Sequence, residues 1–202
     1  MTEAWQKPAA PANFAFTAAN LEKANAFVAR YPQGRQQSAV MPLLDLAQRQ
    51  LGWLPPVAIE YVARFLDMPR IRVQEVASFY TMYRLRPVGR HVVQVCTTTP
   101  CWLRDCDAIV ETCRRKLGVE LGGTTQDGRF TLLEVECLGA CVNAPMLQID
   151  DDYYEDLTPE TTERVLEAFA RGEKPKPGPQ GGRRASEPAG GPTTLAKFAK
   201  DA

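Results

Sequence analysis

Hydrophobic positions before residue 86 recur at three- and four-residue steps, which is the period of an α-helix. One such stripe covers residues 21–31, with Asn20 as its expected N-cap and Pro32 just after its end. Further stripes predict helices over residues 38–51, with Ser38 as a cap, 55–66 and 73–80. Together they predict a small helical bundle. It follows a mobile leader, residues 1–12, that is rich in Ala and Pro.

Beyond residue 86 the hydrophobic pattern changes to that of alternating strands and helices. Strands are expected at 91–96, 130–137 and 146–150. A helix over 100–117 is expected between the first two strands, and a helix over 159–172 is expected at the end, after an acidic turn over 150–156. Residues 87–172 are therefore predicted to form an α/β domain.

The last thirty residues, 173–202, contain too much Pro, Gly and Ser to build a core. We expect an extended tail that docks on a partner, with residues 176–195 ordered only when that partner is present. The whole chain is thus predicted as 1–86 leader and bundle, 87–172 α/β domain and 173–202 tail. Because the bundle precedes the α/β unit, the fold class is α/β with an N-terminal helical bundle.

Charge and hydropathy narrow the possible partners. Across 202 residues, 24 basic side chains balance 24 acidic ones, so no long-range field draws the chain to nucleic acid or to an anionic membrane. No apolar run reaches the ~18 residues that span a bilayer, and the N-terminus lacks the pattern of a secretory signal. We therefore expect a cytoplasmic protein with no membrane insertion of its own.

Six cysteines are the candidate chemistry of the chain. Cys106 and Cys113 share one helical stripe with Ile109, so both are expected in the hydrophobic core rather than at a site. In a reducing compartment the remaining clustered cysteines indicate metal or redox chemistry more often than disulfides.

Four thiols remain, and the predicted elements bring them to two neighbouring strand ends. Cys96 ends one strand, and Cys101 lies in the first turn of the next helix, where the helix dipole is expected to lower its pKa. Thr99 is the expected cap of that helix. Cys137 ends another strand, and Cys141 follows after three small or apolar residues.

The spacing is C-x4-C, then thirty-five residues, then C-x3-C. Four thiolates suit either an iron–sulfur cluster or a structural zinc ion, because both prefer sulfur. The long C-x4-C loop favours a two-iron cluster over zinc, for which C-x2-C knuckles are more usual. A thiol or disulfide role is the third interpretation, although the C-x-x-C of thioredoxin itself is absent.

Four stretches resemble a known family: "VCTTTPCWLR", "ECLGACVNAPMLQI", "SFYTMYRLRPVGRH" and "GPQGGRRASEPAGGPTTL". They are similar to the small thioredoxin-like [2Fe-2S] subunit of respiratory NADH:quinone oxidoreductase, complex I. The resemblance implies a thioredoxin-like domain whose cluster ligands are Cys96, Cys101, Cys137 and Cys141. Where relatives usually carry Gly-Ser, this chain has Asp105-Cys106, so a carboxylate is expected near the cluster.

The resemblance also implies the partners. Because the chain has no G-x-G-x-x-G loop of its own, NADH and FMN are expected on a neighbouring subunit, beside other peripheral-arm subunits of complex I. A cytoplasmic, membrane-peripheral location through the complex follows. The small subunit of an NAD-linked hydrogenase or formate dehydrogenase has the same cysteine pattern and is the alternative. A zinc-stabilised assembly scaffold is a further one.

Other conspicuous residues have plainer interpretations. His91 is expected at a strand edge rather than as a ligand, because four sulfurs already complete the site. Phe79, Tyr80 and Tyr83 are expected in the bundle core and in interdomain packing. Pro145 stands where thioredoxin-like folds often have a cis proline. The pair Arg183–Arg184 is expected to be solvated or paired with acids of a partner.

Overall fold

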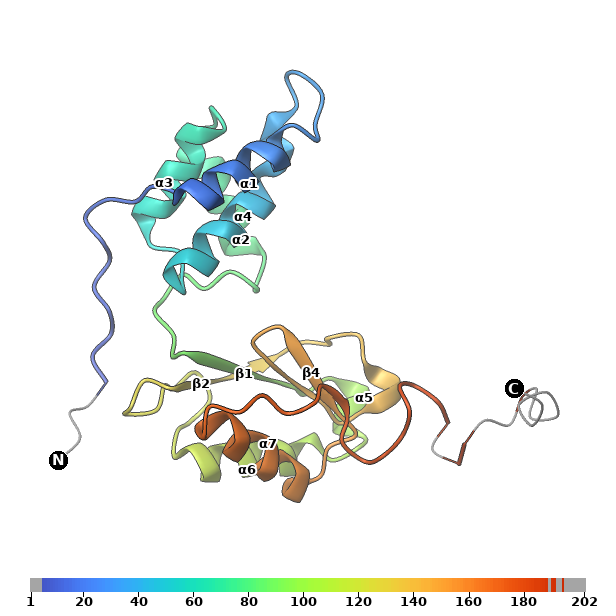
Figure 1. Ribbon diagram of the computed structural model, residues 1–202. Helices are drawn as coiled ribbons and strands as arrows, with labels where there is room; N and C mark the ends of the chain where they lie inside the picture. The colour runs from blue at the N-terminus through green and yellow to red at the C-terminus, as the bar shows by residue number, and fades with distance from the viewer. Residues whose placement is uncertain (1–4, 189, 192–193, 195–202) are drawn as a thin grey trace. The chain divides into compact units, whose positions relative to one another are not determined.

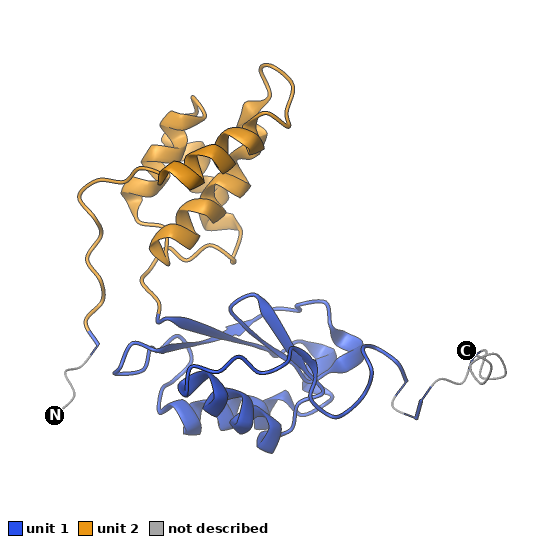
Figure 2. Ribbon diagram, viewed as in Figure 1, with its two compact units in different colours: residues 1–5, 89–202 blue, residues 6–88 orange. Residues whose placement is uncertain are grey.

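The computed structural model describes residues 5–188, 190, 191 and 194, and the chain divides into two compact units between Val88 and Gly89. Figure 2 colours the unit that contains residues 6–88 orange and the other unit blue. Trp5 groups with the second unit. No helix within the described residues has the length and hydrophobicity needed to cross a membrane.

The unit of residues 6–88, called the first unit here because it comes first in the chain, is helical, as the periodicity predicts. Its elements are α1 (Ala18–Val28), the 3-10 helix η1 (Gln36–Ala39), α2 (Val40–Leu51), α3 (Pro56–Phe65) and α4 (Arg70–Phe79). Their apolar faces meet in one core that includes Leu43, Leu44, Ile59 and Val62. Gly52, at a φ of +83°, ends α2 in the left-handed conformation that glycine adopts without strain.

Two predicted caps in this unit are wrong, and a prediction about aromatic residues is confirmed only in part. The cap of α1 is Thr17, whose hydroxyl accepts from the Asn20 N–H at 3.3 Å, so the helix begins one turn earlier than expected. Ser38 lies within η1 rather than at a cap. Of the expected aromatic group, Tyr83 lies in the bundle core as predicted, whereas Phe79 and Tyr80 are exposed, because α4 ends at Phe79.

The second unit is a five-stranded mixed sheet with helices on one face (Figure 1). Its strands are β1 (His91–Cys96), β2 (Phe130–Val135), β3 (Leu147–Ile149), β4 (Asp152–Glu155) and β5 (Gly178–Pro179), in the spatial order β2-β1-β3-β4-β5. β1 pairs in parallel with β2 and antiparallel with β3, so Cys96 stands opposite Val135 and Val95 opposite Leu147. Helices α6 (Cys106–Leu117) and α7 (Pro159–Ala170) cover the sheet and close its core.

The helix expected over 100–117 is instead broken in two. A four-residue helix, α5 (Thr99–Trp102), has Thr98 rather than Thr99 at its N-cap position, without a capping side-chain hydrogen bond, and α6 starts at Cys106. Asp105 between them has a φ of +62°, and aspartate is one of the few residues besides glycine that adopt this region readily. The break turns Trp102 away from the apolar stripe, and its side chain is 60% exposed.

The acidic stretch expected as a turn forms a hairpin. Asp150, at a φ of +55°, starts the turn, and residues 152–155 pair with β3 as β4. Tyr153 and Tyr154 in the middle of this stretch are good strand formers, which outweighs the acidic residues around them. Helix α7 is as predicted, and the Ala144–Pro145 peptide bond is cis, which confirms the expectation for Pro145.

Part of the predicted tail lies on its own domain. Gly178–Pro179 adds to the sheet beside β4, and Gln180 N–H donates to the Glu155 carbonyl at 2.8 Å. Arg183 pairs with Asp156 of the same chain, so its expected pairing with a partner or with solvent is wrong. Residues 189, 192, 193 and 195–202 lie outside the described residues, and docking of the tail on a partner stays a prediction.

Candidate metal centre

The first pair of predicted ligands is buried at the end of β1. Cys96 is the last residue of the strand, and Cys101 lies in α5 after a short turn. Both side chains belong to a small buried cluster with Ala144 and Met146. The Cys96 N–H donates to the Met146 carbonyl at 3.3 Å, so β1 and the segment before β3 hold this pair together.

Hydrogen bonds at this pair favour a thiolate on Cys96. Burial by itself raises the pKa of Cys96, but the Thr98 hydroxyl at 3.4 Å from Sγ, together with backbone bonds from Thr98 and Leu138, lowers it below its ordinary value. Burial and the neighbouring Cys96 sulfur raise the pKa of Cys101 to about 12. The expectation of a lowered pKa at Cys101 is therefore wrong, because a four-residue helix has too small a dipole to offset burial.

The second pair lies on the loop between β2 and β3, on the surface. Cys137 and Cys141 are exposed, and their Sγ atoms are 3.2 Å apart. The Gly139 N–H points back at the Cys137 Sγ at 3.4 Å, in a turn where glycine has a φ of +86°. The pKa of Cys137 is lowered by the hydrogen bond from the Cys141 thiol and by Gly139, whereas the pKa of Cys141 is raised by Cys137.

Thr98 and Leu138 bring the two pairs into one site. The Thr98 hydroxyl acts on the sulfurs of both Cys96 and Cys137, and the Leu138 N–H, on the second loop, reaches Cys96. The charge on Cys96 also raises the pKa of Cys141. The loops that carry the two pairs therefore lie near one another, although thirty-five residues separate Cys101 from Cys137.

This donor set suits a two-iron cluster. In each pair the pKa of one thiol is lowered and the pKa of the other is raised, and the neighbouring sulfur contributes to both shifts. Among the described residues, no group of three or more histidine, cysteine or carboxylate side chains is arranged to hold a metal ion. Two pairs of thiols, with backbone N–H groups aimed at the sulfurs, match the four-cysteine ligation and sulfur hydrogen bonding of [2Fe-2S] centres.

The remaining cysteines and the histidine lie where the sequence places them or nearby. Cys113 is fully buried in the sheet–helix core, as expected. Cys106 is also fully buried, but it packs with Cys96 and Cys101, and its pKa is raised by burial and by Asp107. His91 starts β1, at the opposite end from Cys96, and its Nδ1 lies 2.7 Å from Asp150.

The sequence analysis did not identify three residues that support the ligand loop, which is the loop that carries Cys137 and Cys141. The Tyr153 hydroxyl donates to the Leu138 carbonyl at 2.8 Å, Asn143 bonds both Glu155 and the tail, and Arg183 bonds the Val142 carbonyl. Interpreting "DDYYED" as a strand would have placed Tyr153 near the loop. The other two contacts join residues about forty positions apart, for which the sequence holds no local signal.

Comparison with known proteins gives a consistent picture. A sequence model of the thioredoxin-like [2Fe-2S] ferredoxin family matches residues 24–170. An NADH-quinone oxidoreductase subunit of Rickettsia bellii is 58% identical over 156 residues, covering 77% of this chain and 93% of the relative. The NADH-quinone oxidoreductase subunit of the same name in Rickettsia felis is 55% identical over 159 residues, covering 78% and 95%.

Among solved structures, an air-oxidized NAD+-reducing [NiFe]-hydrogenase superposes with a TM-score of 0.56 at 18% identity. The superposition covers 64% of this chain and 23% of that chain. At this identity the likeness concerns the fold alone. The predicted thioredoxin-like architecture of the α/β domain is confirmed by the family match.

Proposed function

The chain belongs to the thioredoxin-like [2Fe-2S] ferredoxin family, and from this premise we propose that it is the electron-transfer subunit of an NADH:quinone oxidoreductase. Cys96, Cys101, Cys137 and Cys141 are the proposed ligands of its cluster. The observation that carries the proposal is that the Thr98 hydroxyl acts on a sulfur of each pair, Cys96 in the buried one and Cys137 in the exposed one.

The reaction divides the work between this chain and a partner. A [2Fe-2S] centre exchanges one electron at a time, whereas NADH gives up a hydride, so a flavin has to mediate between them. We place FMN and NADH on a neighbouring subunit, because the chain has no phosphate-binding G-x-G-x-x-G loop. This chain's own part is to hold the sulfurs and to balance their negative charge with the N–H groups of Thr98, Leu138 and Gly139.

The surface around the second pair fits contact with that partner. Cys137 and Cys141 are exposed, and three large apolar side chains from neighbouring segments stand beside the site largely in solvent: Trp102 at 60%, Leu103 at 70% and Val142 at 63% exposure. Exposed apolar groups gathered around a redox centre favour close approach of a second protein. We propose that the flavin-bearing subunit covers this face.

The assembly implied by this role is a peripheral one. The partners we propose are the flavin- and NADH-binding subunit and the other peripheral-arm subunits of complex I. The complex would then hold the chain at the cytoplasmic side of the membrane, with no insertion of its own. The equivalent small subunit of an NAD-linked hydrogenase or formate dehydrogenase, which has the same cysteine pattern, is the second candidate.

Cysteine variants of the anaerobically purified chain test the proposed centre. We expect a red-brown protein with two irons and two sulfides, as a [2Fe-2S] cluster requires. Cys101→Ala should abolish the colour, because it removes a ligand, whereas Cys113→Ala should keep it, because that sulfur lies in the distant core.

The same measurement separates the competing functions. A colourless chain with one bound zinc would replace the electron carrier by a structural scaffold. Colour that survives Cys101→Ala would remove this residue from the ligand set. Co-purification with a quinone-reducing assembly supports the leading proposal, and co-purification with a hydrogenase or formate dehydrogenase supports the second candidate.

A further inference from the structure

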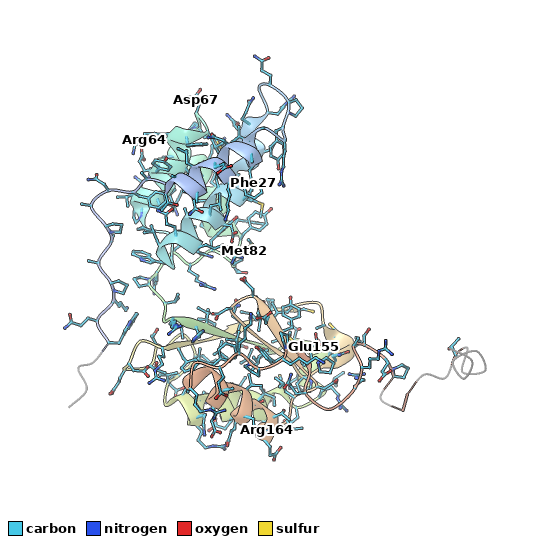
Figure 3. All side chains as sticks on the ribbon, in the orientation of Figure 1. Phe27, Arg64, Asp67, Met82, Glu155 and Arg164 are labelled. Carbon is cyan, nitrogen blue, oxygen red and sulfur yellow. The ribbon has the colours of Figure 1, made fainter. Side chains whose placement is uncertain are left out.

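Residues 178–187, here called the strap, return along the sheet to the end that carries the ligand loop. In Figure 1 the red segment after α7 runs back towards the end of the sheet where α5 lies. The strap begins as β5 beside β4, and the Gln180 N–H donates to Glu155, which is labelled in Figure 3. Its later residues then reach the loop that carries Cys141.

Arg183 is the main contact of the strap. Its Nε donates to Asp156 Oδ2 at 2.9 Å, and its Nη2 also bonds the Asp156 carboxylate. The two side chains are 15% and 17% exposed, so water screens this pair less than a surface pair. The same Nη2 donates at 3.0 Å to the carbonyl of Val142, the residue next to Cys141. One guanidinium therefore joins the strap, the end of β4 and the ligand loop.

Asn143 makes a second, independent connection between the same parts. It is buried, and its Nδ2 donates to Glu155 at 2.7 Å and to the Ala185 carbonyl in the strap at 2.9 Å. The backbone carbonyl of Asn143 accepts a hydrogen bond from the Asp156 N–H at 2.8 Å. Ala185 has a φ of +47°, a region that alanine rarely adopts, so the strap is held in a conformation that its sequence alone does not favour.

We propose that Arg183 is a positioning residue that, through the strap, holds the Cys137–Cys141 loop in its ligating geometry. The need for such a residue follows from the location of this pair. Cys96 and Cys101 are embedded in secondary structure, but Cys137 and Cys141 lie on an exposed loop whose only helical element is the three-residue 3-10 helix η2 (Cys141–Asn143). The strap adds tertiary contacts at Val142 and Asn143 to those that the loop already receives from Tyr153 and Glu155 of β4.

The inference rests on the proposed function only for its effect on the cluster. Its test uses Arg183→Gln in the full-length chain, with Arg184→Gln as a matched control. Arg184 is the next residue and is exposed, and it contacts the rest of the strap through its backbone N–H, which donates to the Glu187 carboxylate. The control therefore removes an equal charge without removing the bond to Val142 or Asp156.

Three readouts are compared between the two variants. Hydrogen exchange of residues 137–144 should become about tenfold faster in Arg183→Gln, because a charge-assisted bond at the loop is lost. Cluster loss to an iron chelator should accelerate by about the same factor, since the second ligand pair opens more often. The electron paramagnetic resonance spectrum of the reduced cluster should also change. Arg183→Lys keeps the positive charge but lacks the planar guanidinium, so its exchange and cluster-loss rates should lie between those of the unchanged chain and Arg183→Gln.

Arg184→Gln should match the unchanged chain in all three measurements. The proposal is overturned if Arg183→Gln behaves like Arg184→Gln. It is also overturned if exchange rises equally across the sheet and α7, because the residue would then stabilise the whole domain rather than the loop. A colourless unchanged chain would reject the proposed function, while the exchange comparison would still decide the role of the strap.

Discussion

The two pairs of proposed cluster ligands in this protein are held in different ways. Cys96 and Cys101 lie at the end of β1 and in α5, buried against Met146. Cys137 and Cys141 lie on an exposed loop beyond β2, where a glycine turn and contacts from distant residues keep the sulfurs 3.2 Å apart. One pair is placed by secondary structure and packing, and the other by individual hydrogen bonds.

This difference suggests a division of labour. The buried pair excludes water from one side of the site, and the exposed pair leaves the other side open to an electron-transfer partner. Regular elements are stiff but occupy space on all sides, whereas a loop can present sulfur at the surface. The loop then needs ties such as Tyr153 and Arg183 to stay in place. Mutations around the two pairs should therefore differ in the size of their effect and in the property that they change.

The largest effect is expected from Met146→Ala. Met146 is 1% exposed and fills the wall behind the buried pair, so truncation should lower the free energy of unfolding by about 2–5 kcal/mol. Denaturant unfolding of the full chain measures this loss. Val142→Ala, in the exposed loop, should stay within about 0.5 kcal/mol. Similar losses for both variants would mean that the two pairs are supported equally.

An intermediate effect is expected from Tyr153→Phe. Removing the hydroxyl leaves the Leu138 carbonyl without that donor and should cost about 1 kcal/mol of stability. The cluster should also be released faster to a chelator, because the second ligand loop loses a tie. Tyr154→Phe is the matched control, since its hydroxyl bonds the carbonyl of Pro175, away from both pairs. If Tyr154→Phe accelerates release as much, Tyr153 has no special role at the loop.

The smallest effect concerns the charge beside the buried pair. Asp105→Gly and Asp105→Asn should both raise the midpoint potential, because a negative charge near the cluster opposes reduction. An exposed charge of this kind is worth about 10–40 mV in a one-electron titration. Since glycine and asparagine both tolerate the φ of +62° at this position, the two variants should agree. An unchanged or lower potential in Asp105→Asn would assign no electrostatic role to the carboxylate.

Much of the fold is readable from the sequence because its signals are local. The strand over 91–96 and helix α7 follow directly from hydrophobic period, proline and capping residues. The helix break at Asp105 is less readable, since an aspartate in the left-handed region has no hydrophobic signature. The short strand β4 was hidden because its charged neighbours favour a turn in any local window.

The candidate ligands could be selected from spacing alone, because each pair lies within six residues and follows a predicted strand. The different environments of the two pairs could not be predicted from spacing. That Cys101 has its pKa raised rather than lowered depends on burial against the sheet, which involves residues far along the chain. The same is true of Cys106, whose position on a helical stripe indicates burial but not its contact with the ligand pair.

The sequence by itself determined most of the elements, the four candidate sulfurs and the family resemblance, since these depend on periodicity and spacing over short stretches. Only the tertiary structure decided which pair is buried and which exposed, that the Leu138 N–H reaches Cys96, and that Arg183 in the tail reaches the loop beside Cys141. The physical reason is that these contacts join segments about forty residues apart. Such segments meet only after the sheet has formed, so no local pattern records them.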